Sequence, residues 1–169
     1  MQKTNKFKSK IAFLAYYQIA GGTVGILLLI WLIASTFPVQ GMSILLYLLM
    51  AVFFGLSICS GWLLIEKRIE AGLTLSKINQ ILQIFGLAFG GFAFEYVAGV
   101  AVFIGINLED SASFMFNFSF SKLELYVNSS KDFAKVEVNL IAIYLVYLII
   151  KLQNAIASDR RLGVSEEDA

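Results

Sequence analysis

Histidine is absent from this chain of 169 residues, and cysteine and proline occur once each, as Cys59 and Pro38. Without histidine the chain has no imidazole ligand for a metal and no base for a Ser–His or Cys–His nucleophile system. A single cysteine excludes an intramolecular disulfide and every two-cysteine zinc motif. We therefore predict that the protein is not an enzyme and that it holds neither a metal nor a cofactor.

Charged residues are also scarce: they make up 15% of the chain, whereas 59% is hydrophobic and the mean hydropathy is +0.78. Soluble domains contain about 25% charged and about 45–50% apolar residues. The longest stretch without Asp, Glu, Lys or Arg, Ile11 to Ile65, covers 55 residues. These features predict an integral membrane protein with the lipid bilayer as its first partner. The net charge of +1 provides no field that would attract nucleic acid, so no nucleic-acid partner is expected.

The apolar runs predict four membrane-spanning helices, because about 20 apolar residues are needed to cross a hydrocarbon core about 30 Å thick. The expected spans are about 11–37, 42–65, 81–106 and 136–152. The first two are separated by a turn signal that contains Pro38. The fourth has only 13 charge-free residues, Val138 to Ile150, so a re-entrant or interfacial helix is the alternative there.

The fold predicted from these spans is an all-α integral membrane protein, a four-helix transmembrane bundle. A single transmembrane domain is expected over residues 1–157. Residues 158–169 are polar and without periodicity, which predicts a flexible cytoplasmic tail.

The distribution of basic residues predicts the orientation of these spans. With the N-terminus inside, the cytoplasmic segments carry ten Lys and Arg residues, whereas the outward segments carry three, Lys122, Lys131 and Lys135. Cytoplasmic loops are enriched in Lys and Arg, so both termini should be cytoplasmic, in a multi-pass protein of the cell (inner or plasma) membrane. The basic N-terminus resembles the start of a signal peptide, but its apolar run continues to Phe37, which is too long for one.

The outward segment 107–135 has the alternation of a β-strand. Phe116, Phe118 and Phe120 alternate with polar residues, and the phase slips by one near Ser121–Lys122. A β-hairpin-like outward loop is therefore expected between the third and fourth helices. Because an isolated hairpin is only marginally stable, the three phenylalanines should be covered by helix ends, by lipid or by a partner protein, and they are the predicted partner-binding residues.

Glu95 is the only charged residue between Ile78 and Leu108, a stretch of 31 residues. An ionisable group inside a membrane span is a functional-site hypothesis by default. Because the predicted spans offer no Lys or Arg nearby, we expect Glu95 to be protonated and to hydrogen-bond with neighbouring helices. The side chains expected at a similar depth are Tyr144, Tyr147, Thr23 and Ser57. Such a carboxyl either binds a proton or cation, or holds helices together by hydrogen bonding.

Four amides, Gln18, Asn79, Gln80 and Gln83, are expected near the cytoplasmic ends of the first and third spans. At that depth polar side chains reach water, so we interpret them as interfacial, with a polar vestibule as the alternative.

Two functions of different classes fit these observations. The first is a non-enzymatic accessory or structural subunit that docks a partner through its outward loop. The alternative is a small proton- or cation-coupled transporter or channel, as a homo-oligomer, that uses the intramembrane carboxylate of Glu95.

Overall fold

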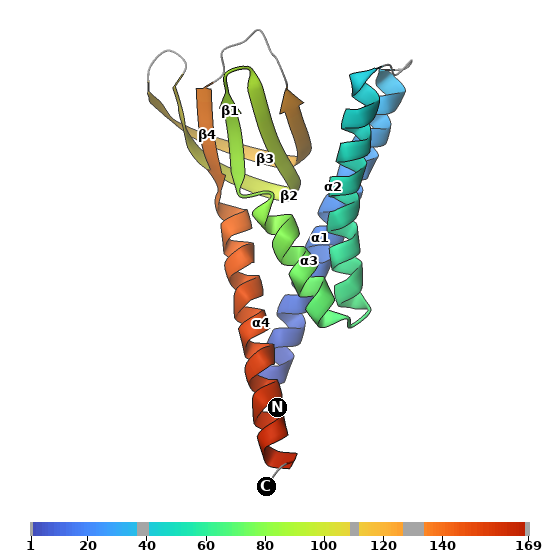
Figure 1. Ribbon diagram of the computed structural model, residues 1–169, viewed down its shortest axis with the longest axis vertical. Coiled ribbons are helices and arrows are strands. Elements are labelled where there is room, and N and C mark those ends of the chain that lie inside the picture. Colours follow the sequence, from blue (N-terminus) through green and yellow to red (C-terminus); the bar gives the residue numbers. More distant parts are fainter. Residues whose placement is uncertain (1, 37–40, 109–111, 127–133, 168–169) are drawn as a thin grey trace.

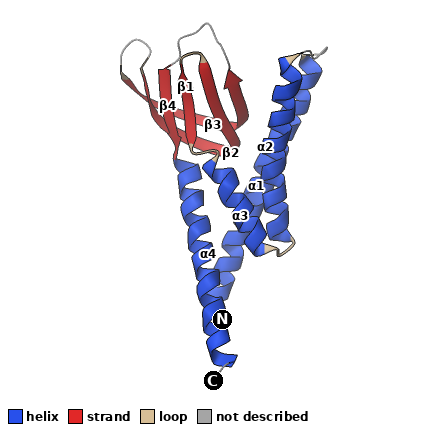
Figure 2. Ribbon diagram, in the orientation of Figure 1, coloured by secondary structure: helices blue, strands red, loops and turns tan. Residues whose placement is uncertain are grey.

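The computed structural model describes residues 2–36, 41–108, 112–126 and 134–167, and these residues form a mixed α/β fold (Figure 2). Four helices and four strands follow one another along the described chain. Their bounds are α1 Gln2–Ser35, α2 Met42–Ile65, α3 Ile69–Ile81, β1 Phe85–Phe89, β2 Phe92–Asn107, β3 Ser113–Tyr126, β4 Ala134–Asn139 and α4 Leu140–Glu167. The predicted all-α four-helix bundle is therefore wrong.

The error lies in the segment 81–106, which was expected to be a membrane-spanning helix and forms β1 and most of β2 instead. Hydropathy measures how apolar a segment is and does not distinguish a helix from a pair of buried strands. The segment is rich in Phe, Val and Ile, which favour strands, and in glycine, which weakens a helix. Gly90 and Gly91 have φ angles of +57° and +81°, and they form the turn that connects β1 to β2.

Within the described residues, three helices are long and apolar enough to cross a membrane: Phe7–Ser35 of α1, Ser43–Ile65 of α2 and Leu140–Ser158 of α4. α1 and α2 pack together as a helical hairpin. Their close approach depends on Gly22, where an added Cβ atom would lie 2.7 Å from the carbonyl oxygen of Phe54.

α4 begins four residues later than the span predicted from 136, because β4 occupies the preceding residues. The Asn139 side chain accepts hydrogen bonds from the backbone N–H groups of Ile141 (3.1 Å) and Ala142 (3.3 Å). An asparagine in this position satisfies N–H groups that have no partner inside the helix, which places the start of α4.

Three of the strands close on one another. β1 pairs with the start of β2, from Phe92 to Phe94, and also with β4. β4 in turn pairs with the end of β2, from Phe103 to Asn107. β2 can serve both neighbours because its pairing with β3 shifts register between Val97 and Val100, a bulge that bends the strand.

β3 pairs with β2 along its length, from Ser113 to Tyr126. Among the described strands it has no second neighbour, so it is the outer strand of the sheet.

The sheet lies beside one half of the α1–α2 hairpin and α3 lies beside the other half (Figure 1). α3 leads directly into β1, and α4 runs from the sheet back towards the end of the molecule where α1 begins. Two apolar clusters hold these parts together. The first joins α1, α3 and α4 around Leu14, Leu73 and Ile149, and the second joins the hairpin to the sheet around Phe54 and Tyr96.

Candidate functional site

Glu95 is a buried residue at the centre of a charge cluster in the sheet. Its side chain is 3% exposed, and its two carboxylate oxygens lie 2.9 Å from Nζ of Lys122 and 3.5 Å from Nζ of Lys135. Each lysine also contacts the acidic residue two positions further along its own strand: Lys122 reaches Glu124 and Lys135 reaches Glu137, both at 3.2 Å. We call these five residues the charge cluster.

The strand register brings the five residues together. Glu124 on β3 stands opposite Glu95 on β2. Glu137 on β4 stands opposite Gly86 on one side and Gly105 on the other. Gly105 is required there, because a Cβ atom would lie 2.3 Å from the carbonyl oxygen of Val136. The closed pairing of β1, β2 and β4 thus encloses polar side chains.

The charge cluster contains three carboxylates and two ammonium groups, so its formal charges do not cancel. Glu137 is 1% exposed, and Lys135 is the cation that pairs with it. Removing one partner of a buried ion pair is strongly destabilising, because the remaining charge has lost its solvent and its counter-charge. The structure therefore depends on both lysines.

This arrangement differs from the surroundings expected for Glu95, because two lysines lie beside its carboxylate. The sequence offered no cation within the predicted spans, and a hydrogen-bonded neutral acid was expected for that reason. Lys122 and Lys135 come from the segment predicted to be an outward loop. They reach Glu95 because that segment folds back as strands of the same sheet.

The four side chains expected beside Glu95 lie elsewhere. Tyr144 and Tyr147 are exposed on α4, where the ring of Tyr147 lies 5.8 Å from Nζ of Lys151, and Thr23 is exposed on α1. Ser57 is buried on α2. In the described part of the chain, none of the four makes an ion pair or hydrogen bond with Glu95.

Ser57 belongs to a second buried cluster, made of uncharged polar groups from three helices and β2. The Gln18 amide donates to Oγ of Ser76 (2.7 Å), and the Asn79 amide donates to Oγ of Ser57 (3.2 Å). The Tyr96 hydroxyl lies 2.9 Å from Oδ1 of Asn79, which connects the helices to the sheet.

The expectation that Gln18, Asn79, Gln80 and Gln83 are interfacial is therefore wrong, since each is at most 1% exposed. Their spacing along the two segments was visible in the sequence. They are buried because α3 packs against α1 and α2, and no local sequence pattern indicated that packing.

A third set of contacts attaches the middle of α1 to the bulge in β2. The Tyr17 hydroxyl donates to the carbonyl of Val100 (2.8 Å) and lies 3.1 Å from the Val100 nitrogen. Ser121 on β3 donates to the carbonyl of Gly21 (2.9 Å) and accepts from the Gly99 N–H (3.0 Å). These bonds satisfy backbone groups that the bulge removes from strand pairing.

The predicted partner-binding residues lie on β3 and are exposed. Phe114, Phe116, Phe118 and Phe120 are between 53% and 75% exposed, whereas the intervening Ser119 is buried. We call these four residues the phenylalanine surface. It adjoins the edge of β3 that has no strand neighbour among the described residues.

Chemically, the side chains of these clusters offer paired charges and hydrogen bonds. The described residues contain no group of three or more His, Cys, Asp or Glu side chains placed to hold a metal. In comparisons with family models, curated proteins and solved structures, this chain has no match.

Proposed function

We propose that this chain is a non-enzymatic accessory subunit of a membrane assembly, which binds a partner protein through β3. The observation that carries the proposal is the combination of the phenylalanine surface with a free strand edge. An added strand from a partner would complete the backbone hydrogen bonding of β3, and the phenylalanines would provide apolar contact.

The sequence of β3 supports this proposal. Soluble proteins protect an exposed sheet edge with charged residues, proline or a bulge. From Ser113 to Ser121 the strand contains no charged residue and no proline, and its register with the end of β2 is regular. Such an edge is suited to pairing with another chain.

The alternative, a proton- or cation-coupled transporter, has weaker support. A coupling carboxylate must exchange its ion during transport, whereas the two oxygens of the Glu95 carboxylate already contact Lys122 and Lys135. The group also lies within a sheet rather than along a path between helices. These contacts favour a structural role for the charge cluster.

Site-specific photo-crosslinking tests the proposal. A photoreactive phenylalanine analogue is placed singly at Phe116, Phe118 and Phe120 in the full chain, expressed in its own host. Strand addition predicts that all three positions crosslink to the same protein. The crosslinked residue of that protein should shift by two positions from Phe116 to Phe118, and again from Phe118 to Phe120. This shift follows from the two-residue period of paired strands.

Leu45 provides the matched control, because it is an exposed apolar residue on α2. The analogue at Leu45 should give no such adduct. Adducts of twice the mass of the chain would instead assign the edge to a second copy. Equal adducts from Leu45 and from β3, with no register, would contradict strand addition.

A further inference from the structure

The outer surface of the sheet is apolar and its enclosed side is charged, the opposite of a sheet that folds in water. Large apolar side chains on β1, β2 and β4 are exposed by between 42% and 79%. They are Phe85, Leu87, Phe89, Phe92, Ile106 and Val136. The phenylalanine surface extends this layer over β3. Apolar outer faces around a polar interior are found in β-structures that are surrounded by lipid.

The contacts between the sheet and the helices fix the depth of the sheet relative to the spans. The Tyr96 hydroxyl donates to the carbonyl of Phe53 (2.7 Å), at the middle of the α2 span Ser43–Ile65. Ser121 contacts Gly21, at the middle of the α1 span Phe7–Ser35. From these contacts the sheet extends towards the α1–α2 connection, alongside the other half of both spans (Figure 1).

The lengths of α3 and β1 agree with this depth. A hydrocarbon core is about 30 Å thick, so each half is about 15 Å. β1 has 5 residues, which extend about 16 Å at about 3.3 Å per residue. α3 has 13 residues, which extend about 20 Å at about 1.5 Å per residue. Together α3 and β1 cover the height that α2 crosses as a single helix.

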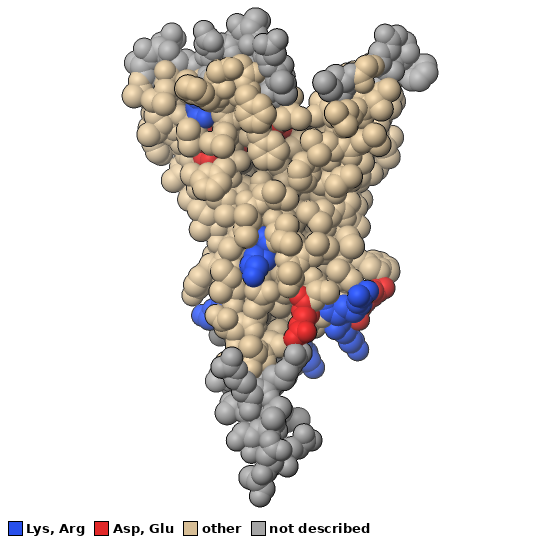
Figure 3. Space-filling view, in the orientation of Figure 1, with Lys and Arg blue, Asp and Glu red and all other residues tan. Residues whose placement is uncertain are grey.

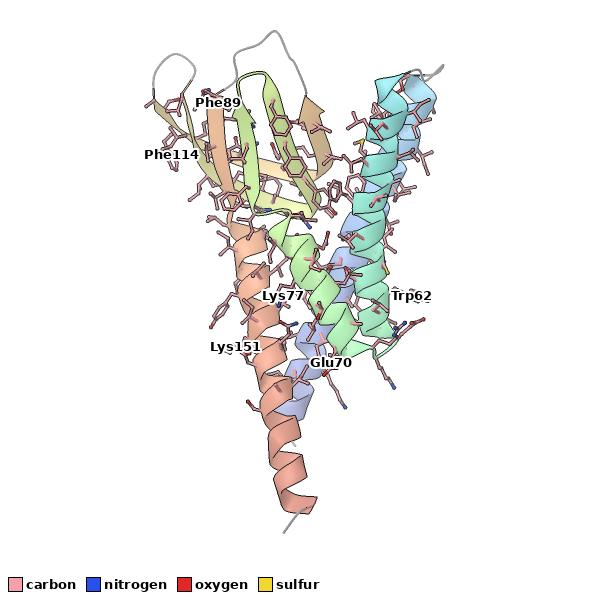
Figure 4. All side chains as sticks on the ribbon, in the orientation of Figure 1. Trp62, Glu70, Lys77, Phe89, Phe114 and Lys151 are labelled. Atoms are coloured by element: carbon pink, nitrogen blue, oxygen red, sulfur yellow. The ribbon has the colours of Figure 1, made fainter. Side chains whose placement is uncertain are left out.

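The exposed charges support the same placement. On the face shown in Figure 3, small patches of Lys or Arg and of Asp or Glu are visible over the sheet, and more of the charged residues lie towards the opposite end. Figure 4 shows Phe89 and Phe114 on the sheet, far from Glu70 and Lys77. Trp62 donates to Glu66 (2.7 Å) near that opposite end, a position where aromatic side chains mark a membrane interface.

We infer that the sheet is immersed in one leaflet of the bilayer and that lipid acyl chains cover its outer surface. The leaflet is the one on the side of the α1–α2 connection. An apolar groove of about 170 Å³, lined by Leu28, Trp31 and Leu123 among others, separates the hairpin from β3 and also receives acyl chains. Glu95 and Glu137 are at most 3% exposed and so avoid the hydrocarbon, whereas Lys122 and Glu124 on β3 are partly exposed.

This inference does not require the proposed function, but it restricts the partner. An open sheet edge in lipid favours pairing, because each unpaired backbone group costs free energy there. A partner of β3 must therefore reach the edge within the bilayer, as an integral membrane protein does.

Fluorescence quenching by brominated lipid tests the immersion. Trp31 and Trp62 are the two tryptophans of the chain, and both are replaced by phenylalanine. Single tryptophans are then introduced as Phe89→Trp and Phe118→Trp. Each purified full-length variant is reconstituted into phosphatidylcholine vesicles with and without lipid brominated in mid-chain.

Two positions calibrate the signal. Val52 is an exposed apolar residue within the α2 span, and Ser158 is the exposed last residue of the α4 span. Immersion predicts that Phe89→Trp and Phe118→Trp lose as much fluorescence to brominated lipid as Val52→Trp. Quenching by aqueous iodide equal to that of Ser158→Trp, without quenching by lipid, would overturn the inference.

A second measurement covers the case in which a tryptophan disturbs the sheet. In a Cys59→Ser background, Leu87→Cys should react with a water-soluble maleimide as slowly as Val52→Cys. Reaction as fast as that of Ser158→Cys would also overturn the inference. Since the vesicles contain no partner and Phe89 and Leu87 lie on β1, these results are independent of crosslinking at β3. If lipid quenches the tryptophans but β3 gives no crosslinks, the placement of the sheet in the bilayer is supported and the accessory function is refuted.

Discussion

At the scale of single residues, the charge cluster shows how a carboxylate is kept inside an apolar protein. Glu95 interacts with both lysines, but each lysine also has a carboxylate of its own, Glu124 for Lys122 and Glu137 for Lys135. The five residues are therefore unequal: the loss of Glu95 leaves two complete pairs, whereas the loss of Lys135 leaves the buried Glu137 without its cation.

This asymmetry gives the first prediction. Lys135→Met should lower the free energy of unfolding by about 3–5 kcal/mol, the range for breaking a buried ion pair. Glu95→Gln should lower it by less, because two pairs remain. Adding Glu137→Gln to Lys135→Met should recover part of the loss. Denaturant unfolding in mild detergent measures all three.

Lys67→Met is the control, since Lys67 is exposed in the connection between α2 and α3. It should change stability by about 0.5 kcal/mol or less, as surface substitutions do. A Lys135→Met variant as stable as this control would mean that the cluster carries no ion pair of consequence.

At the scale of elements, the β2 bulge determines how the sheet is attached to the helices. The bulge removes regular pairing around Gly99, whose φ of +118° favours glycine, and Tyr17 and Ser121 provide the missing hydrogen bonds. An element that ends a strand pairing inside an apolar environment needs such replacements, because unsatisfied backbone groups are costly there.

The second prediction concerns this attachment. Tyr17→Phe removes one hydroxyl that serves both the carbonyl and the nitrogen of Val100, and it should lower stability by about 1–3 kcal/mol. The neighbouring Tyr16 is 65% exposed and provides a matched control. Tyr16→Phe should have almost no effect. Equal effects of the two substitutions, measured by thermal unfolding in detergent, would remove the role assigned to Tyr17.

At the scale of the whole molecule, the helices and the sheet occupy different parts of its length. α1 and α2 extend over the full height, α3 and the first part of α4 lie beside one half, and the sheet lies beside the other (Figure 1). The start of α1 and the end of α4 are at the same end of the molecule. This arrangement agrees with an orientation in which both termini are cytoplasmic.

The third prediction tests that orientation. In a Cys59→Ser background, Thr36→Cys places a thiol after α1 at an exposed position, and Ser158→Cys places one on α4. In intact cells, a membrane-impermeant maleimide should label Thr36→Cys and should label Ser158→Cys only after the membrane is permeabilised. The asymmetry of basic residues is the physical basis. The reverse pattern would invert the orientation.

The sequence by itself predicted membrane spans, because composition and the length of apolar runs depend on no fold, and α1, α2 and α4 are long and apolar enough to cross a membrane. It also indicated α1 and α2 as spans, the strand character around Phe116–Phe120, and Glu95 as an exceptional residue. Hydropathy could not separate a helix from paired strands, so the segment 81–106 was misassigned.

Only the tertiary structure decided the partners of Glu95. Lys122 and Lys135 are 27 and 40 positions away in the chain, and no local pattern joins them to it. Their approach depends on strand register, on the β2 bulge and on the absence of a side chain at Gly105. These are long-range effects, in which the position of each residue is set by the strands beside it rather than by its neighbours in sequence.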